Sequence, residues 1–157
     1  MSEPAIVPAG SVAPPISATA SDGAPFDLAK RAGEWTVLYF YPRANTSGCT
    51  TEALGFESRL PEFASLCALV VGVSADKPPA IRRFAEKYGL AFPLIADPER
   101  AIIDAYGARL PDKNTASRVT FLIAPDGTIA RAWPKVIAAG HADQVLAALR
   151  ELQAAAS

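Results

Sequence analysis

The chain of 157 residues is half hydrophobic and carries 15 Lys and Arg against 16 Asp and Glu, a net charge of −1. This length suits one domain with its own core, and the near-neutral charge gives no reason to expect binding to nucleic acid or to a membrane. One histidine and two cysteines are too few for a structural zinc site or a disulfide framework. We therefore expect no metal and no cofactor.

The N-terminal segment, residues 1–15, is expected to be an extended lead-in to a single domain that spans residues 1–157. It is rich in Pro, Ala and Ser and has an acidic residue where a signal peptide needs basic ones. No stretch of the chain approaches the ~20 apolar residues that span a bilayer. We expect a cytoplasmic protein.

The first predicted strand covers residues 35–41, a run of β-branched and aromatic residues that Pro42 ends. A helix is expected next, because apolar side chains recur at helical spacing at Ala53, Phe56, Leu60 and Phe63. Pro61 must kink or restart this helix. Residues 66–73 form a second buried run, apolar on both faces as in a parallel strand that is covered on each side.

The second half of the chain continues the alternation. An amphipathic helix is predicted from Ile81, Phe84, Ala85 and Tyr88. Gly89 is placed to end it, and residues 91–96 form a short strand. Residues 119–123 and 128–133 read as a hairpin around Asp-Gly, followed by a last helix from about residue 142. This order predicts an α/β protein with a mixed sheet.

Cys49 is the first candidate for chemistry. It lies at the expected start of the first long helix, beyond the carboxyl end of a strand, where active groups gather in open α/β sheets. Unpaired N–H groups and the helix dipole favour the thiolate there, which is the nucleophilic form. The polar surroundings, PRANTSGCTTE, favour this interpretation over a buried structural cysteine. Cys67 lies inside an apolar run, where we expect it to pack.

Pro42, Thr46 and Cys49 match the PxxxTxxC active-site signature of the peroxiredoxins. The stretch YFYPRANTSGCTTEA resembles the bacterioferritin-comigratory, or PrxQ, branch of that family. The resemblance continues at residues 70–76, 84–97, 117–127 and 140–149. It implies a thioredoxin-like fold, with a central mixed β-sheet flanked by helices on both faces. It also implies a thiol peroxidase, an antioxidant enzyme of cell redox homeostasis.

The resemblance gives each residue of the motif a role. Cys49 corresponds to the peroxidatic cysteine, whose thiolate attacks one oxygen of the peroxide bond. Arg118, in SRVTFLI, corresponds to the arginine that holds the thiolate and neutralises charge on the departing oxygen. Thr46 would hydrogen-bond the peroxide and help to orient it. Pro42 would close the pocket and exclude water.

Two further residues are expected to bind substrate. Backbone N–H groups around Gly48 would complete a polar cradle, and Glu52 would orient an arginine or cap the helix. The proximity of Arg118 to Cys49 rests on the resemblance alone, because 69 residues separate them.

The chain departs from the branch at the resolving cysteine. Many members carry one five residues after the peroxidatic cysteine, where this chain has Leu54, and others carry one in the second main helix, at Ala85 here. Cys67 is the remaining, poorly placed candidate. A 15-residue helix between it and Cys49 would be about 22 Å long, whereas disulfide partners need Cα atoms within about 7 Å. We therefore predict a one-cysteine mechanism, with thioredoxin, glutaredoxin or a small-molecule thiol reducing the sulfenic acid.

Other functions remain open at this point. A thioredoxin-fold redox sensor or binding module would be oxidised stoichiometrically at Cys49, and an atypical two-cysteine peroxidase would use Cys67 after the first helix melts. A disulfide reductase would need a CxxC pair, which is missing. A cysteine hydrolase would need a histidine base, and His141 is expected to be a surface or capping residue. The branch is often monomeric, and we expect a monomer.

Overall fold

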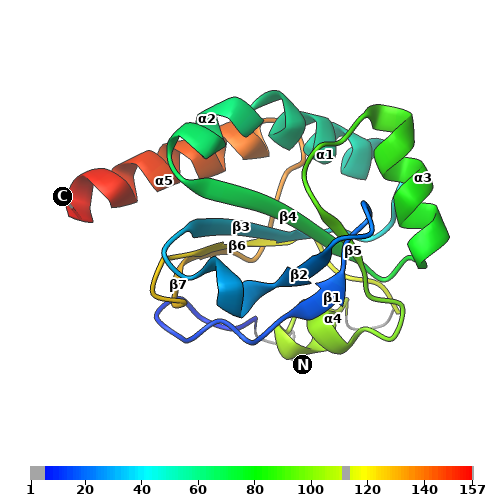
Figure 1. The fold of residues 1–157 in the computed structure, drawn as a ribbon, viewed down its shortest axis with the longest axis horizontal. Helices are drawn as coiled ribbons and strands as arrows, with labels where there is room; N and C mark the ends of the chain where they lie inside the picture. Colours follow the sequence, from blue (N-terminus) through cyan, green and yellow to red (C-terminus); the bar gives the residue numbers. More distant parts are fainter. Residues whose placement is uncertain (1–5, 111–113, 157) are drawn as a thin grey trace.

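A five-stranded mixed sheet forms the centre of the protein, in the strand order β5-β4-β3-β6-β7 (Figure 1). The computed structural model describes residues 6–110 and 114–156. Strand β4 runs parallel to both β3 and β5, whereas β6 is antiparallel to both β3 and β7. A separate two-stranded sheet joins β1 and β2.

The strands are β1 (Ser17–Thr19), β2 (Pro25–Asp27), β3 (Trp35–Phe40), β4 (Ala68–Ser74), β5 (Leu94–Ala96), β6 (Val119–Ile123) and β7 (Ile129–Trp133). The α-helices are α1 (Ser47–Ser58), α2 (Leu60–Ser65), α3 (Pro78–Tyr88), α4 (Ala101–Ala105) and α5 (His141–Ala156), and a 3₁₀ turn, η1, covers Leu28–Arg31. None of the helices in the described part of the chain is long and apolar enough to cross a membrane.

The predicted hairpin and the predicted break in the first helix are both confirmed. Strands β6 and β7 are joined by a tight turn in which Gly127 has a φ of +89° and the Asp126 carboxylate accepts the Thr128 N–H at 3.0 Å. Helix α1 ends before Arg59, and α2 starts with Pro61 in its first turn. Proline is tolerated there because the first N–H groups of a helix have no partner within it.

The predicted bounds of two strands are wrong. Strand β4 begins at Ala68 rather than at residue 66, because Cys67 has a φ of +58° and closes the turn that follows α2. The N–H of Cys67 donates to the Ala64 carbonyl at 3.0 Å, a bond that a residue within a strand could not make. Strand β5 covers only the last three residues of the expected run, Leu94–Ala96.

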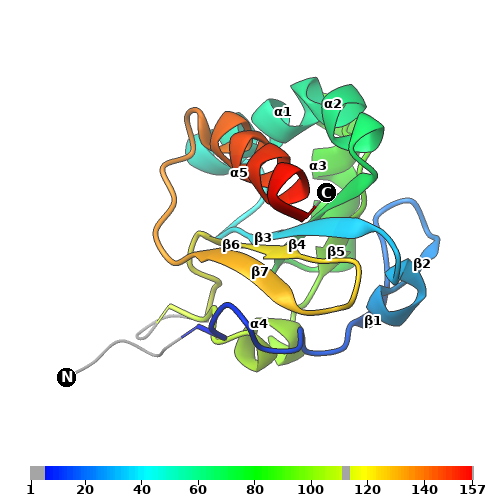
Figure 2. The same ribbon diagram turned by 90° about the vertical axis from the view of Figure 1, so that its left-hand side faces the viewer.

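The sheet divides the interior into two cores (Figure 2). Alternate side chains of β3 point to opposite faces, so that Tyr39 packs with α1, α2, α3 and α5 while Phe40 packs against Tyr106 beside α4. Helices therefore flank both faces, as predicted, although α4 is the one α-helix on the second face in the described residues.

The N-terminal segment takes part in the fold from residue 6 onward, and residues 1–5 lie outside the described residues. Ala13 and Ile16 are buried in the second core. Ser11 accepts the N–H of Ile129, and Ile129 in turn accepts the N–H of Gly10, so that residues 10 and 11 lie beside the start of β7. The β1–β2 hairpin, η1 and α4 were not predicted, because elements of three to five residues are too short to show a period.

Gly72→Ala, in the middle of β4, is expected to destabilise the protein. A Cβ there would lie 2.8 Å from Leu94 Cδ2 and 2.9 Å from Tyr39 Cζ, so the packed core would have to shift. Overpacking of this kind costs about 1–3 kcal/mol, which urea unfolding can measure. Gly55→Ala is the control, since its Cβ would meet Ala142 Cβ at an ordinary 3.6 Å. Equal stability of the two variants would contradict this description of the core.

Candidate active site

Cys49 is the third residue of α1, whose N-cap is Thr46. The N–H of Thr50 donates to the Thr46 carbonyl, so the N–H groups of residues 47–49 lie ahead of the first intrahelical bond. Together with the positive end of the helix dipole, they favour a negative charge at this point. Cys49 is only 1% exposed, so the sulfur lies beneath the surface and not on it.

Arg118 brings a positive charge to the sulfur of Cys49. Its Nη2 lies 3.5 Å from Cys49 Sγ, and its Nη1 donates to Glu52 Oε1 at 2.9 Å. The sheet explains the contact between residues so distant in sequence. Val119, the first residue of β6, pairs with Phe40, the last residue of β3, so Arg118 lies at the edge of the sheet from which the chain leads into α1.

Glu52 lies one helical turn after Cys49, on the same side of α1, and is 1% exposed. One of its oxygens binds Arg118, and the other has no hydrogen-bond partner among the described residues. Burial raises the pKa of this carboxyl from 4.5 to about 7, although the neighbouring arginine acts in the opposite direction. The contact with Arg118 is the one that the first of the two roles expected for Glu52, to orient an arginine, would require.

The absence of a side chain at Gly48 permits this arrangement. A Cβ on Gly48 would lie 3.0 Å from Arg118 Nη2 and 3.6 Å from its Cζ. The guanidinium therefore packs directly against the backbone of the first turn of α1. The structure thus brings Arg118 to Gly48 and Cys49, the proximity that the resemblance implied.

The loop before α1 carries the other two motif residues. Thr46 is exposed, and its hydroxyl donates to the Arg43 carbonyl at 3.0 Å; Pro42 is half-buried. Two residues that sequence reasoning missed hold this loop in place. The Asp76 carboxylate accepts the N–H of Ala44 at 2.7 Å, and Asn45, with a φ of +64°, accepts hydrogen bonds from side chains of α3. A single sequence carries no signal that Asn45 adopts a left-handed backbone conformation.

Two tyrosines form the aromatic floor of the site. Tyr39 and Tyr41 share a core cluster with Cys49, and their ring centroids are 5.5 Å apart. Neither hydroxyl has a hydrogen-bond partner among the residues that the structure describes. Burial raises the pKa of both phenols well above the ordinary value, so both are neutral at physiological pH.

Cys67 does not pack in the core, and that expectation was wrong. It is exposed, and it lies in the turn before β4 rather than within a strand. Its carbonyl accepts the N–H of Trp35, at the start of β3, whereas Cys49 follows the end of that strand. The two cysteines are therefore at opposite ends of the sheet.

His141 was expected to be a surface or capping residue, and the expectation of a surface position was wrong. It is the first residue of α5 and only 1% exposed. Its ring lies edge-on to Phe56 and to Trp133, with centroids 5.9 and 5.8 Å away. These two neighbours come from α1 and β7, both distant from His141 in sequence, so no local pattern could have indicated the burial.

Glu52 is expected to make the stability of the protein fall as pH rises. The carboxyl loses its proton near pH 4.5 in the unfolded chain and near pH 7 in the folded protein, so the folded protein binds more protons between these values. Folding is therefore disfavoured progressively from pH 4.5 to 7, by a total on the order of 3 kcal/mol. Glu52→Gln removes this dependence.

The measurement is the free energy of unfolding of wild type and Glu52→Gln in urea across this pH range. The advantage of the variant should grow with pH and level off above about 7. A difference that is constant with pH would contradict the burial argument.

Comparison with known proteins places the chain in a family. Residues 9–132 match the AhpC/TSA family. Peroxiredoxin Bcp of Xanthomonas campestris pv. campestris is 42% identical over 151 residues, which cover 92% of this chain and 92% of that protein.

Solved structures agree in fold. Peroxiredoxin Q of Xanthomonas campestris has a TM-score of 0.82 at 42% identity, over 87% of this chain and 90% of that one. A trapped intermediate/ligand complex of the Xanthomonas campestris bacterioferritin comigratory protein has the same score and coverage at 41% identity. The chain therefore belongs to the AhpC/TSA family, in its Bcp or peroxiredoxin Q branch, and is a thiol peroxidase with a thioredoxin-like fold.

Proposed function

We propose that this peroxidase reduces hydrogen peroxide and organic hydroperoxides through a sulfenic acid on Cys49, and that an external thiol restores the cysteine. The observation that carries the proposal is the 3.5 Å contact between Arg118 Nη2 and Cys49 Sγ at the start of α1. A fixed cation and a helix N-terminus at one sulfur are placed to meet the negative charge that moves during the attack on a peroxide. The alkyl peroxide reduction activity of the Xanthomonas campestris bacterioferritin comigratory protein supports organic hydroperoxides as substrates.

In the first step the Cys49 thiolate attacks one oxygen of the peroxide. A sulfur–oxygen bond forms, the oxygen–oxygen bond breaks, and the departing alkoxide takes a proton and leaves as an alcohol, or as water when the substrate is hydrogen peroxide. Arg118 counters the charge that moves from sulfur to the departing oxygen. Its side chain is 21% exposed, so the guanidinium can meet a substrate, while Glu52 holds its other nitrogen.

The loop residues have supporting roles in this proposal. The Thr46 hydroxyl gives its hydrogen to the Arg43 carbonyl, which leaves the oxygen free to accept the O–H of a hydroperoxide. Pro42 has no N–H to hydrate and is half-buried, which suits a wall that keeps water out. The first-turn N–H groups around Gly48 complete the polar surroundings.

The second step needs a thiol from outside the chain. Leu54 and Ala85 occupy the positions where relatives in the branch would carry a resolving cysteine, and Cys67 lies at the opposite end of the sheet. The external thiolate attacks the sulfenic sulfur, water leaves, and a second thiol releases Cys49 from the mixed disulfide. Thioredoxin, glutaredoxin or a small thiol can serve, and because this cycle needs no second subunit we propose a monomer.

Intact mass after one equivalent of hydrogen peroxide tests the mechanism. In the presence of a sulfenic-acid trap, we expect one adduct at Cys49 in wild type and in Cys67→Ser, and no adduct in Cys49→Ser. Cys67→Ser should also keep multiple turnover with an added thiol, because no step uses that sulfur. Loss of two hydrogens with a Cys49–Cys67 link would overturn the one-cysteine cycle. Oxidation without repeated turnover would indicate a sensor.

Gly48→Ala should slow the oxidation of Cys49 without reducing stability. The added Cβ, 3.0 Å from Arg118 Nη2, pushes the guanidinium from the sulfur, while alanine favours a helix over glycine. Loss of one such contact corresponds to a rate about three- to tenfold lower, which quenched-flow trapping of the sulfenic acid can measure. Ser47→Ala, on the same exposed turn, is the control. A wild-type rate for Gly48→Ala would show that the close packing is not needed.

A further inference from the structure

His141 occupies a buried polar position beneath the candidate active site. Its Nε2 lies 2.8 Å from Thr120 Oγ1 on β6, and its Nδ1 lies 3.1 Å from Gln144 Oε1 on its own helix. Both His141 and Thr120 are almost completely buried. A buried pair of this kind lowers stability if either partner loses its hydrogen bond.

The contacts fix which nitrogen carries the proton. The carbonyl oxygen of the Gln144 side chain can only accept, so Nδ1 of His141 is the donor to it. In the neutral ring Nε2 is then an acceptor, and the Thr120 hydroxyl donates to it. The Thr120 hydroxyl can thus donate to His141 only while the ring is neutral.

Thr120 connects this pair to the reacting groups. Thr120 lies two residues after Arg118, and both side chains contact helices of the first core: Arg118 contacts α1 and Thr120 contacts α5. Its partner across the strands is Tyr39, whose ring stacks on Phe56 of α1 at 4.7 Å. The ring of Phe56 in turn meets His141 edge-on. His141 therefore contacts the strand that follows Arg118 and the helix that carries Cys49.

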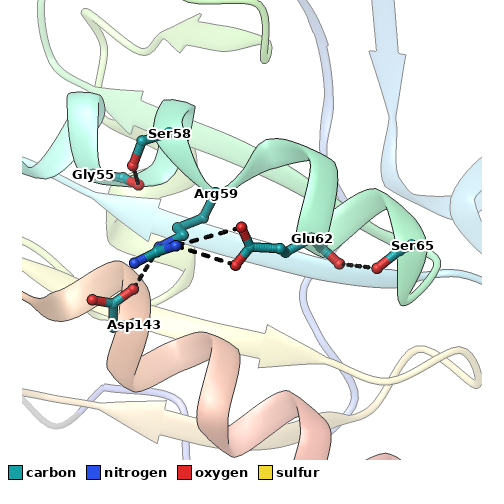
Figure 3. A network of polar contacts seen from close by, with 6 residues as sticks. All are labelled: Gly55, Ser58, Arg59, Glu62, Ser65 and Asp143. Carbon is teal, nitrogen blue, oxygen red and sulfur yellow. Dashed lines mark hydrogen bonds and ion pairs between the residues drawn. The ribbon is translucent and has the colours of Figure 1, made fainter.

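The first turn of α5 has a second, independent attachment. Arg59, between α1 and α2, donates to the Asp143 carboxylate at 2.7 Å and also pairs with Glu62 (Figure 3). These groups are on the surface, and neither Arg59 nor Asp143 has a contact with Thr120. The first turn of α5 thus makes two contacts, one from His141 to Thr120 and one from Asp143 to Arg59. Of these two, the contact of His141 is the one that reaches β6.

We infer that neutral His141 is a positioning residue that holds β6 at Thr120 and thereby keeps Arg118 against Cys49, and that protonation of the imidazole loosens this hold. A proton on Nε2 would turn it into a donor, so the Thr120 oxygen would have to accept and the buried hydroxyl hydrogen of Thr120 would lose its acceptor. The inference rests on the roles proposed above for Cys49 and Arg118.

The charges around the His141 ring also favour its neutral form. Arg118, directly before β6, is the charged group that faces His141 among the described residues; α1 and β7 present Phe56 and Trp133, and α5 presents the uncharged Gln144. Glu52 is already paired with Arg118, and Asp143 with Arg59. Burial lowers the pKa of His141 below 6.5, Arg118 lowers it further, and the bond to Gln144 opposes both. The neutral form is therefore the working form at pH 7.

The test is the rate of Cys49 oxidation by hydrogen peroxide, followed by quenched-flow trapping from pH 5 to 8. His141→Leu removes the acceptor and should lower the rate at pH 7.5 about three- to tenfold. His141→Gln can still accept a hydrogen bond from Thr120, so it should keep most of the rate at pH 7.5. It should lose the part of the fall in rate at low pH that comes from protonation of His141. Thr120→Val should resemble His141→Leu, and Thr120→Ser should resemble wild type.

Asp143→Asn is the control, because it removes the charge of the other contact on the same turn and should leave both the rate and its pH dependence unchanged. Urea unfolding identifies any variant that does not fold; if His141→Leu is one, the Thr120 pair decides. Wild-type rates in Thr120→Val, or the same acid limb in His141→Gln and wild type, would overturn the inference. Failure of the proposed function differs from this, since wild type itself would then show no oxidation of Cys49.

Discussion

The guanidinium of Arg118 is the group on which the candidate site depends. It lies between the Cys49 sulfur and the Glu52 carboxyl, which α1 presents one turn apart. Its position follows from the antiparallel register of β3 and β6, which sets Val119 beside Phe40. A slip of one residue in that register would turn every side chain of β6 to the other face of the sheet. The geometry of the site is thus a property of the central sheet.

This arrangement places charge against an apolar core. The Glu52 carboxyl lies among the side chains of the first core with one oxygen unpaired, and the phenols of Tyr39 and Tyr41 are buried without partners in the described residues. A buried ion pair seldom adds net stability, because desolvation offsets the attraction. The pair between Glu52 and Arg118 therefore contributes mainly by fixing a direction for the guanidinium. Fixing that direction requires the Glu52 carboxyl to be buried, which is unfavourable.

Sequence patterns predicted the elements that have strong local signals: the central strands, the hairpin and the break at Pro61. These patterns failed where contacts with other parts of the chain determine the conformation or burial of a residue. Cys67 continues an apolar run and was expected in the strand, but the turn after α2 takes it into a left-handed conformation. His141 was expected on the surface or as a helix cap, but three elements distant in sequence enclose it. The proximity of Arg118 to Cys49 came from resemblance, because only the register of the sheet creates it.

In the proposed cycle, the burial of Cys49 would link the speed of turnover to the opening of one helical turn. A thiol on another protein must approach the sulfur directly to exchange with it, and a cysteine that is 1% exposed gives such a thiol little access while the first turn of α1 is closed. The closed turn, however, is the state that presents Arg118 and the free N–H groups to the substrate. Mutations that stabilise the closed turn would then speed the oxidation of Cys49 by the peroxide and slow its reduction by the thiol. Selection on such an enzyme would favour an intermediate local stability, not the greatest rigidity.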